Sequence, residues 1–170
     1  MRILVLGGYG LIGLAIARRL HAAGHEVTGL GRDAAAGPRL FPAIRWRHAD
    51  IASLQAAADW APLLAGIDVV VNAAGALQEG ARDNLSHIHH TSIVALVAAC
   101  EAAGNIRIVQ ISAPGAAASA GTEFMRSKAR GDAAVKSSRV PWVVLRPGLA
   151  IGPNAYGGSA LLRMMAALPL

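Results

Sequence analysis

The chain has 170 residues, of which 54% are hydrophobic and 15% charged, and its formal net charge is +6. This composition excludes a disordered chain, and the length suits one globular domain. The single cysteine, Cys100, excludes an internal disulfide framework and a cysteine-based metal cluster. No apolar run reaches the roughly 20 residues that cross a bilayer. We therefore expect a cytoplasmic protein without a membrane span.

Apolar runs of strand length alternate with alanine-rich helical stretches. The sequence predicts strands at residues 3–6, 26–30, 44–48, 67–72, 106–112 and 142–146. It predicts helices at residues 11–23, 53–64, 84–103, 122–138 and 159–168. Gly24 would end the first helix and Ser53 would cap the second. This alternation predicts an α/β fold, a doubly wound parallel (Rossmann) sheet of about six strands in the order 3-2-1-4-5-6.

A glycine-rich turn, GGYGLIG, joins the first strand to the first helix. Gly7 would supply backbone freedom, Gly10 would leave room for a pyrophosphate, and Gly13 would allow close strand–helix contact. The helix start beyond the turn, with Leu11 and Ile12, offers N–H groups to phosphates. These residues predict a dinucleotide site, and a tight turn without a ligand is the alternative.

Short motifs follow this turn in a fixed order. They are HAD at residues 48–50, VVNAAG at 70–75, ISA at 111–113, SKARGDAAV at 127–135 and LRPG at 145–148. With the G-x-x-G-x-x-G spacing, they resemble the short-chain dehydrogenase/reductase superfamily. The resemblance is to its extended and atypical branches, which include NAD(P)-binding epimerase/dehydratase-like proteins.

The resemblance implies cofactor contacts beyond the glycine turn. The residues it assigns are Asp50, Ile51, Ala73, Ala74, Gly75, Lys128, Pro147 and Gly148. Asp50 would meet the adenine amino group, and Ala73 to Gly75 would lie beside the adenine ribose. Lys128 would hydrogen-bond the nicotinamide ribose; a solvated helix lysine is the alternative. Pro147 and Gly148 would lie along the nicotinamide half.

The end of the second strand bears on the choice of cofactor. NAD enzymes place an acidic residue there that holds both ribose hydroxyls and repels a 2′-phosphate. Gly31 stands at this position, and Arg32 follows with a guanidinium suited to phosphate. Asp33 would hold a hydroxyl or cap the next turn. The sequence thus favours NADP(H), with NAD(H) as the alternative cofactor and a solvated Arg32 as the alternative without phosphate recognition.

The catalytic residues depart from the superfamily's pattern. Its proton donor is a tyrosine four residues before the lysine, and Phe124 stands at that position without an exchangeable proton. Ser112 and Lys128 remain as catalytic candidates. His89 stands where the superfamily carries an asparagine that orders a water relay. Tyr156 is either a replacement proton donor or a loop aromatic.

The arginines and a group of histidines raise the question of a nucleic-acid partner or a bound metal. The scattered arginines form no basic run and have no interleaved aromatic residues, so we expect no nucleic-acid partner. On a helix, His87 and His89 would point about 200° apart and His89 and His90 about 100° apart, without a carboxylate or cysteine at ligand spacing. We expect no metal there and place these histidines on the helix surface, near the carboxyl edge of the sheet.

We assign residues 1–155 to the dinucleotide-binding domain and 156–170 to the helical start of a truncated substrate-binding lobe. Extended members of the superfamily continue with a seventh strand and a small lobe, so we expect this chain to be a fragment or a shortened form. An uncovered strand at 142–146 and an apolar last helix favour self-association. We therefore expect a homo-oligomer.

Two classes of function remain. The first is an NADP(H)-dependent oxidoreductase, or its cofactor domain, acting on a small carbonyl or hydroxyl compound. The second is a structural or regulatory nucleotide-binding protein without turnover, like the complex I accessory subunit relatives. Phe124 favours the second, whereas Lys128 and the LRPG motif favour the first, so the sequence leaves the question of enzyme activity open.

Overall fold

The computed structural model describes residues 1–80, 83–151 and 164–167. The strands of this part of the chain are β1 (Arg2–Leu6), β2 (Glu26–Gly31), β3 (Arg45–His48), β4 (Val69–Asn72), β5 (Arg107–Ile111) and β6 (Trp142–Leu145). They form one parallel sheet in the order β3-β2-β1-β4-β5-β6. The predicted Rossmann-like fold class and strand order are confirmed.

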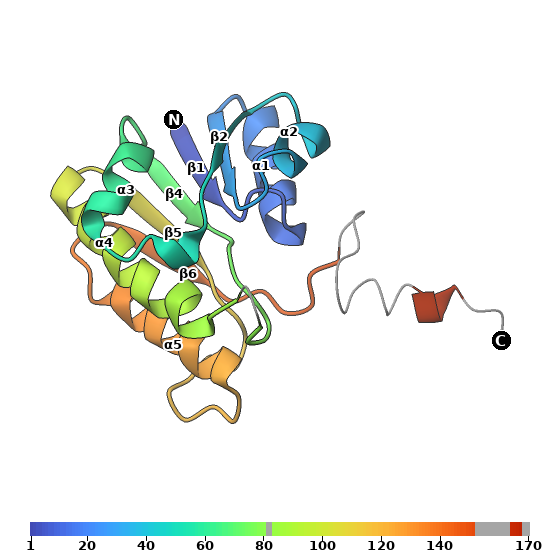
Figure 1. Cartoon of the computed structure of the whole chain (residues 1–170), viewed down its shortest axis with the longest axis vertical. Coiled ribbons are helices and arrows are strands. Elements are labelled where there is room, and N and C mark those ends of the chain that lie inside the picture. The colour runs from blue at the N-terminus through green and yellow to red at the C-terminus, as the bar shows by residue number, and fades with distance from the viewer. Residues whose placement is uncertain (81–82, 152–163, 168–170) are drawn as a thin grey trace.

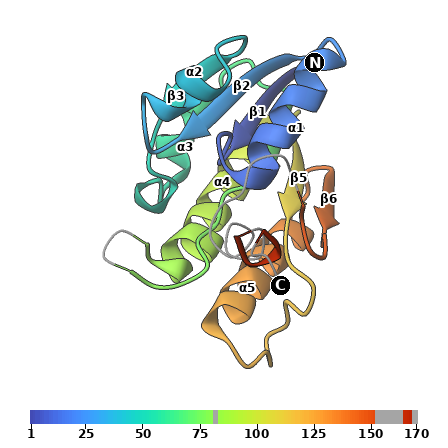
Figure 2. The same ribbon diagram turned by 90° about the vertical axis from the view of Figure 1, so that its right-hand side faces the viewer.

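Helices cover the two faces of the sheet (Figures 1 and 2). They are α1 (Leu11–Ala22), α2 (Ala36–Leu40), α3 (Ala57–Leu64), α4 (Ser92–Ala103) and α5 (Glu123–Lys136). Leu4 and Leu6 of β1 point to the face of α3, α4 and α5, where Trp60 is fully buried. Ile3 and Val5 point to the opposite face, against α1. The central strands β1 and β4 are almost continuously apolar because helices cover both of their faces.

The predicted cap at Ser53 is wrong. Ser53 belongs to a short 3-10 turn, η1 (Ile51–Ser53), and its hydroxyl donates to the carbonyl oxygen of Asp50 at 2.7 Å. The helix begins later, at Ala57. The carboxylate of Asp59 accepts hydrogen bonds from the backbone N–H groups of residues 55 and 56 and so fixes this start.

The other predicted helices differ from the structure mainly at their ends. A π-helical turn, η2 (His87–Thr91), precedes α4 in the region predicted as one helix. Gly24 and Gly104 have φ of +82° and +81° just beyond α1 and α4, as expected for glycines that end helices. Thr122 caps α5 by accepting the N–H of Met125.

The C-terminal predictions fall largely outside the described residues. Residues 164–166 form a helical turn, whereas Tyr156 and most of the helix predicted at 159–168 lie outside the described part, as does most of the segment assigned to the truncated lobe. Among the described residues, no helix has the length and apolarity needed to span a membrane.

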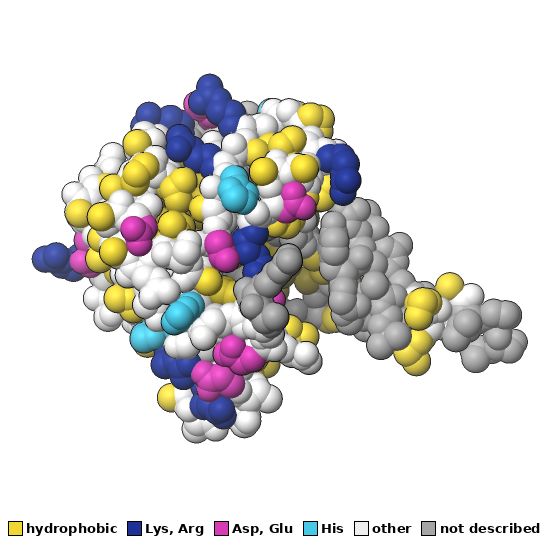
Figure 3. All heavy atoms as spheres, in the orientation of Figure 1, with side chains coloured by type: hydrophobic (Ala, Val, Ile, Leu, Met, Phe, Trp, Pro, Cys, Tyr) yellow, Lys and Arg dark blue, Asp and Glu magenta, His cyan; other side chains and the backbone are white. Residues whose placement is uncertain are grey.

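Basic side chains are dispersed on the face shown in Figure 3 and do not gather in one patch. Several are paired with acidic residues. Arg126 and Arg130 both pair with Glu123, and Arg45 pairs with Glu26.

Candidate functional site

Three glycines shape the turn between β1 and α1. Gly7 has a φ of +66°, a conformation that residues with a side chain rarely adopt. A Cβ on Gly13 would collide with the carbonyl oxygen of Gly7, so only glycine allows this approach of helix to strand. Gly10 caps α1 without a side chain, and residues 11–14 carry no acidic group. The N-terminus of α1 is thus suited to an anion.

A cavity of about 160 Å³ opens beside this turn, at the carboxyl ends of β1, β2 and β4. Eight of the fourteen predicted cofactor residues line it: Gly7, Gly10, Arg32, Asp50, Ile51, Ala73, Ala74 and Gly75. β1 lies between β2 and β4, where the strand order changes direction. Doubly wound sheets bind their ligands at this switch point. We call this cavity the switch-point cleft.

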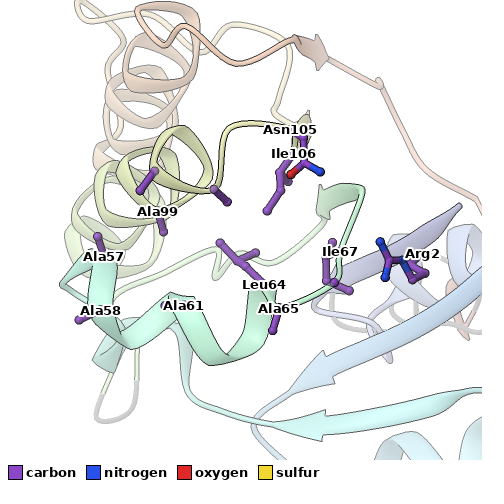
Figure 4. A pocket seen from close by; sticks show the side chains of 13 residues that line it. Arg2, Ala57, Ala58, Ala61, Leu64, Ala65, Ile67, Ala99, Asn105 and Ile106 are labelled. Carbon is purple, nitrogen blue, oxygen red and sulfur yellow. The ribbon is translucent and has the colours of Figure 1, made fainter.

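A second hollow, of about 570 Å³, lies at the amino ends of the strands, between α3 and the end of α4 (Figure 4). Its lining is mostly alanine, with Arg2 at one end. The guanidinium of Arg2 is paired with Asp68 at 3.0 Å. This hollow therefore offers little polar chemistry, and the switch-point cleft is the candidate site.

The ring of Tyr9 lies against Gly31 at the end of β2. A Cβ on Gly31 would collide with the ring of Tyr9. The hydroxyl of Tyr9 accepts the backbone N–H of Asp33 at 3.0 Å. The Asp33 carboxylate accepts the N–H groups of Ala35 and Ala36, which hold its pKa below the usual value. Of the two roles considered for Asp33, the structure shows capping of the next turn.

Arg32 and Asp83 meet at the rim of the cleft. Arg32 Nη1 lies 2.7 Å from Asp83 Oδ1, and both residues line the cavity. Asp50, also in the lining, accepts the N–H of Ala52 at 3.0 Å. Tyr9 and Asp83 were not among the predicted site residues, because their side chains reach the cleft through tertiary contacts that no local motif records.

Lys128 lies behind the cleft rather than in its lining. Its side chain is 7% exposed, and Nζ donates to the carbonyl oxygen of Ile111 at 3.0 Å. Burial lowers the pKa of Lys128 to about 8, against the opposing charge of Asp132. A Cβ on Gly75 would lie 3.3 Å from Nζ. Lys128 therefore approaches the cleft beside Gly75.

Ser112 belongs to a buried network that the sequence analysis missed. Asp132, 2% exposed, accepts the hydroxyl of Ser112 at 2.7 Å and Arg146 Nη2 at 2.9 Å through the same oxygen, Oδ2. Its other oxygen, Oδ1, is buried without a partner among the described residues. Ser112 therefore directs its proton inward, toward a carboxylate. The available signal was the spacing of Asp132, one helical turn after Lys128.

The prediction that His89 lies on the helix surface is wrong, because it is 2% exposed. The N–H of Ala76 donates to His89 Nε2 at 3.2 Å, so Nδ1 carries the proton and donates to Ser127 Oγ at 2.9 Å. Burial and the charges of Lys128 and Arg130 lower the pKa of His89 to about 3. Its ring meets that of Phe124 edge-on, at 5.6 Å between centroids.

The remaining predicted residues do not line the cavity. Leu11, Ile12 and Gly13 belong to the first turn of α1. Pro147 and Gly148 follow β6 and are exposed. The described residues also contain no group of three His, Cys, Asp or Glu side chains that could hold a metal. Burial raises the pKa of the Cys100 thiol to about 12, which removes it as a nucleophile.

The sheet order, the glycine turn and the cleft at the switch point together define a nucleotide-binding α/β domain. A family of NAD(P)H-binding domains matches residues 7–159, and the chain belongs to this family. This match agrees with the dinucleotide-binding domain that the sequence predicts. No curated protein matches the chain at a significant level.

Solved structures share the fold at low sequence identity. The Bordetella bronchiseptica enzyme WbmH in complex with NAD+ is 18% identical, with a TM-score of 0.79 over 98% of this chain and 62% of its own. Thermus thermophilus UDP-glucose 4-epimerase in complex with NAD is 22% identical, with a TM-score of 0.73 over 98% and 61%. The Lactococcus lactis oxidoreductase ylbE is 19% identical, with a TM-score of 0.75 over 92% and 73%. The chain thus spans less than two thirds of the first and second of these structures.

Proposed function

We propose that residues 1–155 bind NADP(H) as the cofactor domain of a short-chain dehydrogenase/reductase-like oxidoreductase acting on a small carbonyl or hydroxyl compound. The observation that carries the choice of cofactor is the pair Gly31 and Arg32: the acid that would repel a 2′-phosphate is absent, and a guanidinium lies at the rim of the cleft. The single cysteine favours the cytoplasm as its compartment.

The residues present fit the parts of such a cofactor. The glycine turn and the start of α1 would hold the pyrophosphate, because no side chain obstructs the approach at Gly10. Asp50 and Ile51 would lie at the adenine, and Ala73 to Gly75 at its ribose. Lys128 would donate to the nicotinamide ribose beside Gly75, with Pro147 and Gly148 toward the nicotinamide. When bound, the reduced cofactor would supply a hydride to a carbonyl compound, and the oxidised cofactor would accept one from a hydroxyl compound.

The test is the titration of an Arg32→Ala variant with NADPH and with NADH. We expect NADPH binding to weaken by about 1.5–3 kcal/mol, the range for a hydrogen bond to a charged group, while NADH binding stays unchanged. Arg45→Ala is the matched control, because Arg45 is an exposed, ion-paired arginine on β3 outside the cleft. Equal losses for both cofactors would mean that Arg32 stabilises the loop and does not read the phosphate.

A second candidate function is nucleotide binding without turnover. It is favoured by Phe124, whose ring packs against His89 and has no proton to donate, and by Ser112, whose proton is directed to Asp132. A screen of carbonyl substrates, with NADPH absorbance as the readout, separates the two candidates. Turnover at ordinary enzyme rates would reject the second, and binding without turnover in the complete parent chain would reject the first.

A further inference from the structure

We propose that Asp83 sets the cofactor preference of the switch-point cleft. Its carboxylate is paired with the guanidinium of Arg32, the group to which a 2′-phosphate would bind. The proposal deepens the proposed function and rests on it. Asp83 then acts as an intramolecular counter-ion of Arg32, which the 2′-phosphate must displace.

Two hydrogen-bond donors that suit a phosphate lie at the end of β2. They are the guanidinium of Arg32 and the backbone N–H of Asp33. Each donates to an oxygen from another segment: Arg32 to the carboxylate of Asp83, and the Asp33 N–H to the hydroxyl of Tyr9. An anion at this rim therefore meets donors that are already engaged.

The carboxylates around this rim differ in what they contact. Asp33 and Asp50 accept backbone N–H groups of the turns that they cap. Asp83 instead faces Arg32, and the two side chains are 31% and 46% exposed. An exposed pair of this kind contributes little to stability, so a ligand can replace the carboxylate at small cost to the fold.

The exchange affects the two cofactors differently. A 2′-phosphate carries nearly two negative charges at neutral pH. It therefore competes with the Asp83 carboxylate for the guanidinium of Arg32, and the carboxylate repels it. The 2′-hydroxyl of NAD(H) is neutral and has no such conflict. Asp83 should therefore reduce the preference for NADP(H) over NAD(H) that Arg32 creates. Removal of the Asp83 charge should increase that preference.

The experiment compares Asp83→Asn with a matched control, Asp68→Asn. Asp68 pairs with Arg2 at 3.0 Å, with exposures of 33% and 53%, at the amino ends of the strands. Each variant and the unmodified chain are titrated at low ionic strength with NADPH, NADH, adenosine 2′,5′-bisphosphate and ADP. Circular dichroism checks that the variants are folded.

For Asp83→Asn, we expect affinity for NADPH and the 2′,5′-bisphosphate to rise roughly three- to tenfold, with NADH and ADP within about twofold. Asp68→Asn should change none of the four. In an Arg32→Ala background, the gain from Asp83→Asn should shrink, because the guanidinium for which the two anions compete is absent.

Three results would overturn the inference. Unchanged or weaker NADPH binding in Asp83→Asn would show that the carboxylate does not compete with the phosphate. Weaker NADH binding with NADPH unaffected would show that Asp83 holds the ribose hydroxyls, as the acid of NAD enzymes does. If neither dinucleotide binds to the unmodified chain or to Asp83→Asn, the proposed function itself fails, and the inference fails with it.

Discussion

At the scale of single residues, Gly7, Gly10 and Gly13 of the glycine-rich turn contribute in different ways. Gly7 needs its positive φ, and Gly13 needs the absence of a Cβ against Gly7. Gly10 has an extended conformation, with φ −69° and ψ 171°, that any residue adopts. A side chain at position 10 therefore conflicts with a ligand rather than with the backbone.

This difference gives a prediction for Gly10→Val. A Cβ there would lie 3.2 Å from the Gly7 carbonyl oxygen, a contact that a small shift relieves, so the chain should still fold. The added methyl groups would occupy the approach to the pyrophosphate, and binding of NADH and NADPH should be abolished. NADPH fluorescence titration and thermal unfolding measure the two effects. Gly121→Val, at an exposed glycine with open space, is the control, and unchanged affinity in Gly10→Val would remove the dinucleotide interpretation.

His89 should make stability depend on pH. In the folded chain its pKa is about 3, whereas the unfolded value is about 6.5. Between these values the unfolded chain binds the additional proton, so the free energy of unfolding falls as the pH falls. From pH 7 to pH 5 the contribution should reach about 2 kcal/mol. Denaturant unfolding of His89→Asn should show a shallower pH dependence than the unmodified chain; equal slopes would contradict the buried, neutral histidine.

The residues of the site divide by how they could be found. The glycines, Arg32, Asp50 and the segment from Ala73 to Gly75 could be predicted, because local motifs place them at strand ends that share one edge of the sheet. Asp83 could not, since its partner Arg32 stands 51 positions away in the sequence. For Asp132 the sequence offers only its spacing from Lys128, because its partner Ser112 stands 20 positions away. His89 was misplaced because a buried histidine requires two specific partners, Ala76 and Ser127, that the sequence pattern does not reveal.

At the scale of elements, α5 packs closely on the π-helical turn η2. A Cβ on Gly131 of α5 would collide with the carbonyl oxygen of His89. The crossing therefore depends on a glycine in a helix interior, where glycine costs about 1 kcal/mol relative to alanine. The same contact positions Lys128, one turn earlier on α5, beside Gly75.

The substitution Gly131→Ala tests this crossing, because helix propensity and packing would change the free energy of unfolding in opposite directions. Helix propensity alone predicts a gain of about 1 kcal/mol, whereas overpacking predicts a net loss of about 1–3 kcal/mol. We expect the loss, because the obstructing atom belongs to the backbone of η2 and has little freedom to move. Chemical denaturation measures the change, and a stabilised variant would contradict the close crossing.

The periodicity of apolar residues is insufficient to predict where helices begin and end. The pattern from residue 53 to 64 suits a helix, yet Asp50 and Asp59 divide it into a 3-10 turn and a helix by accepting different backbone N–H groups. The π-helical turn before α4 lies in a region that the periodicity predicts as one helix. Such hydrogen-bond choices involve few residues and leave the apolar pattern almost unchanged.

At the scale of the whole molecule, the sheet is covered unevenly. On one face, α3, α4 and α5 pack against the core, whereas α1 and α2 cover the other face (Figure 2). Val143 on the edge strand β6 pairs with Val109, whose side chain packs with the cluster on the α1 face. β6 is an outer strand of the described sheet, and its Val143 and Leu145 are 41% and 47% exposed.

This edge predicts that the chain self-associates through β6. An edge strand with exposed apolar side chains offers both unpaired backbone groups and apolar surface to a second copy. Sedimentation velocity should show an average mass that rises with concentration, and Val143→Lys should reduce this rise by placing a charge on the edge. Val94→Lys is the comparison, because Val94 is 46% exposed on α4, away from β6. If Val94→Lys separates the copies and Val143→Lys does not, the contact lies on the helices; if the mass stays that of one chain throughout, β6 does not mediate association.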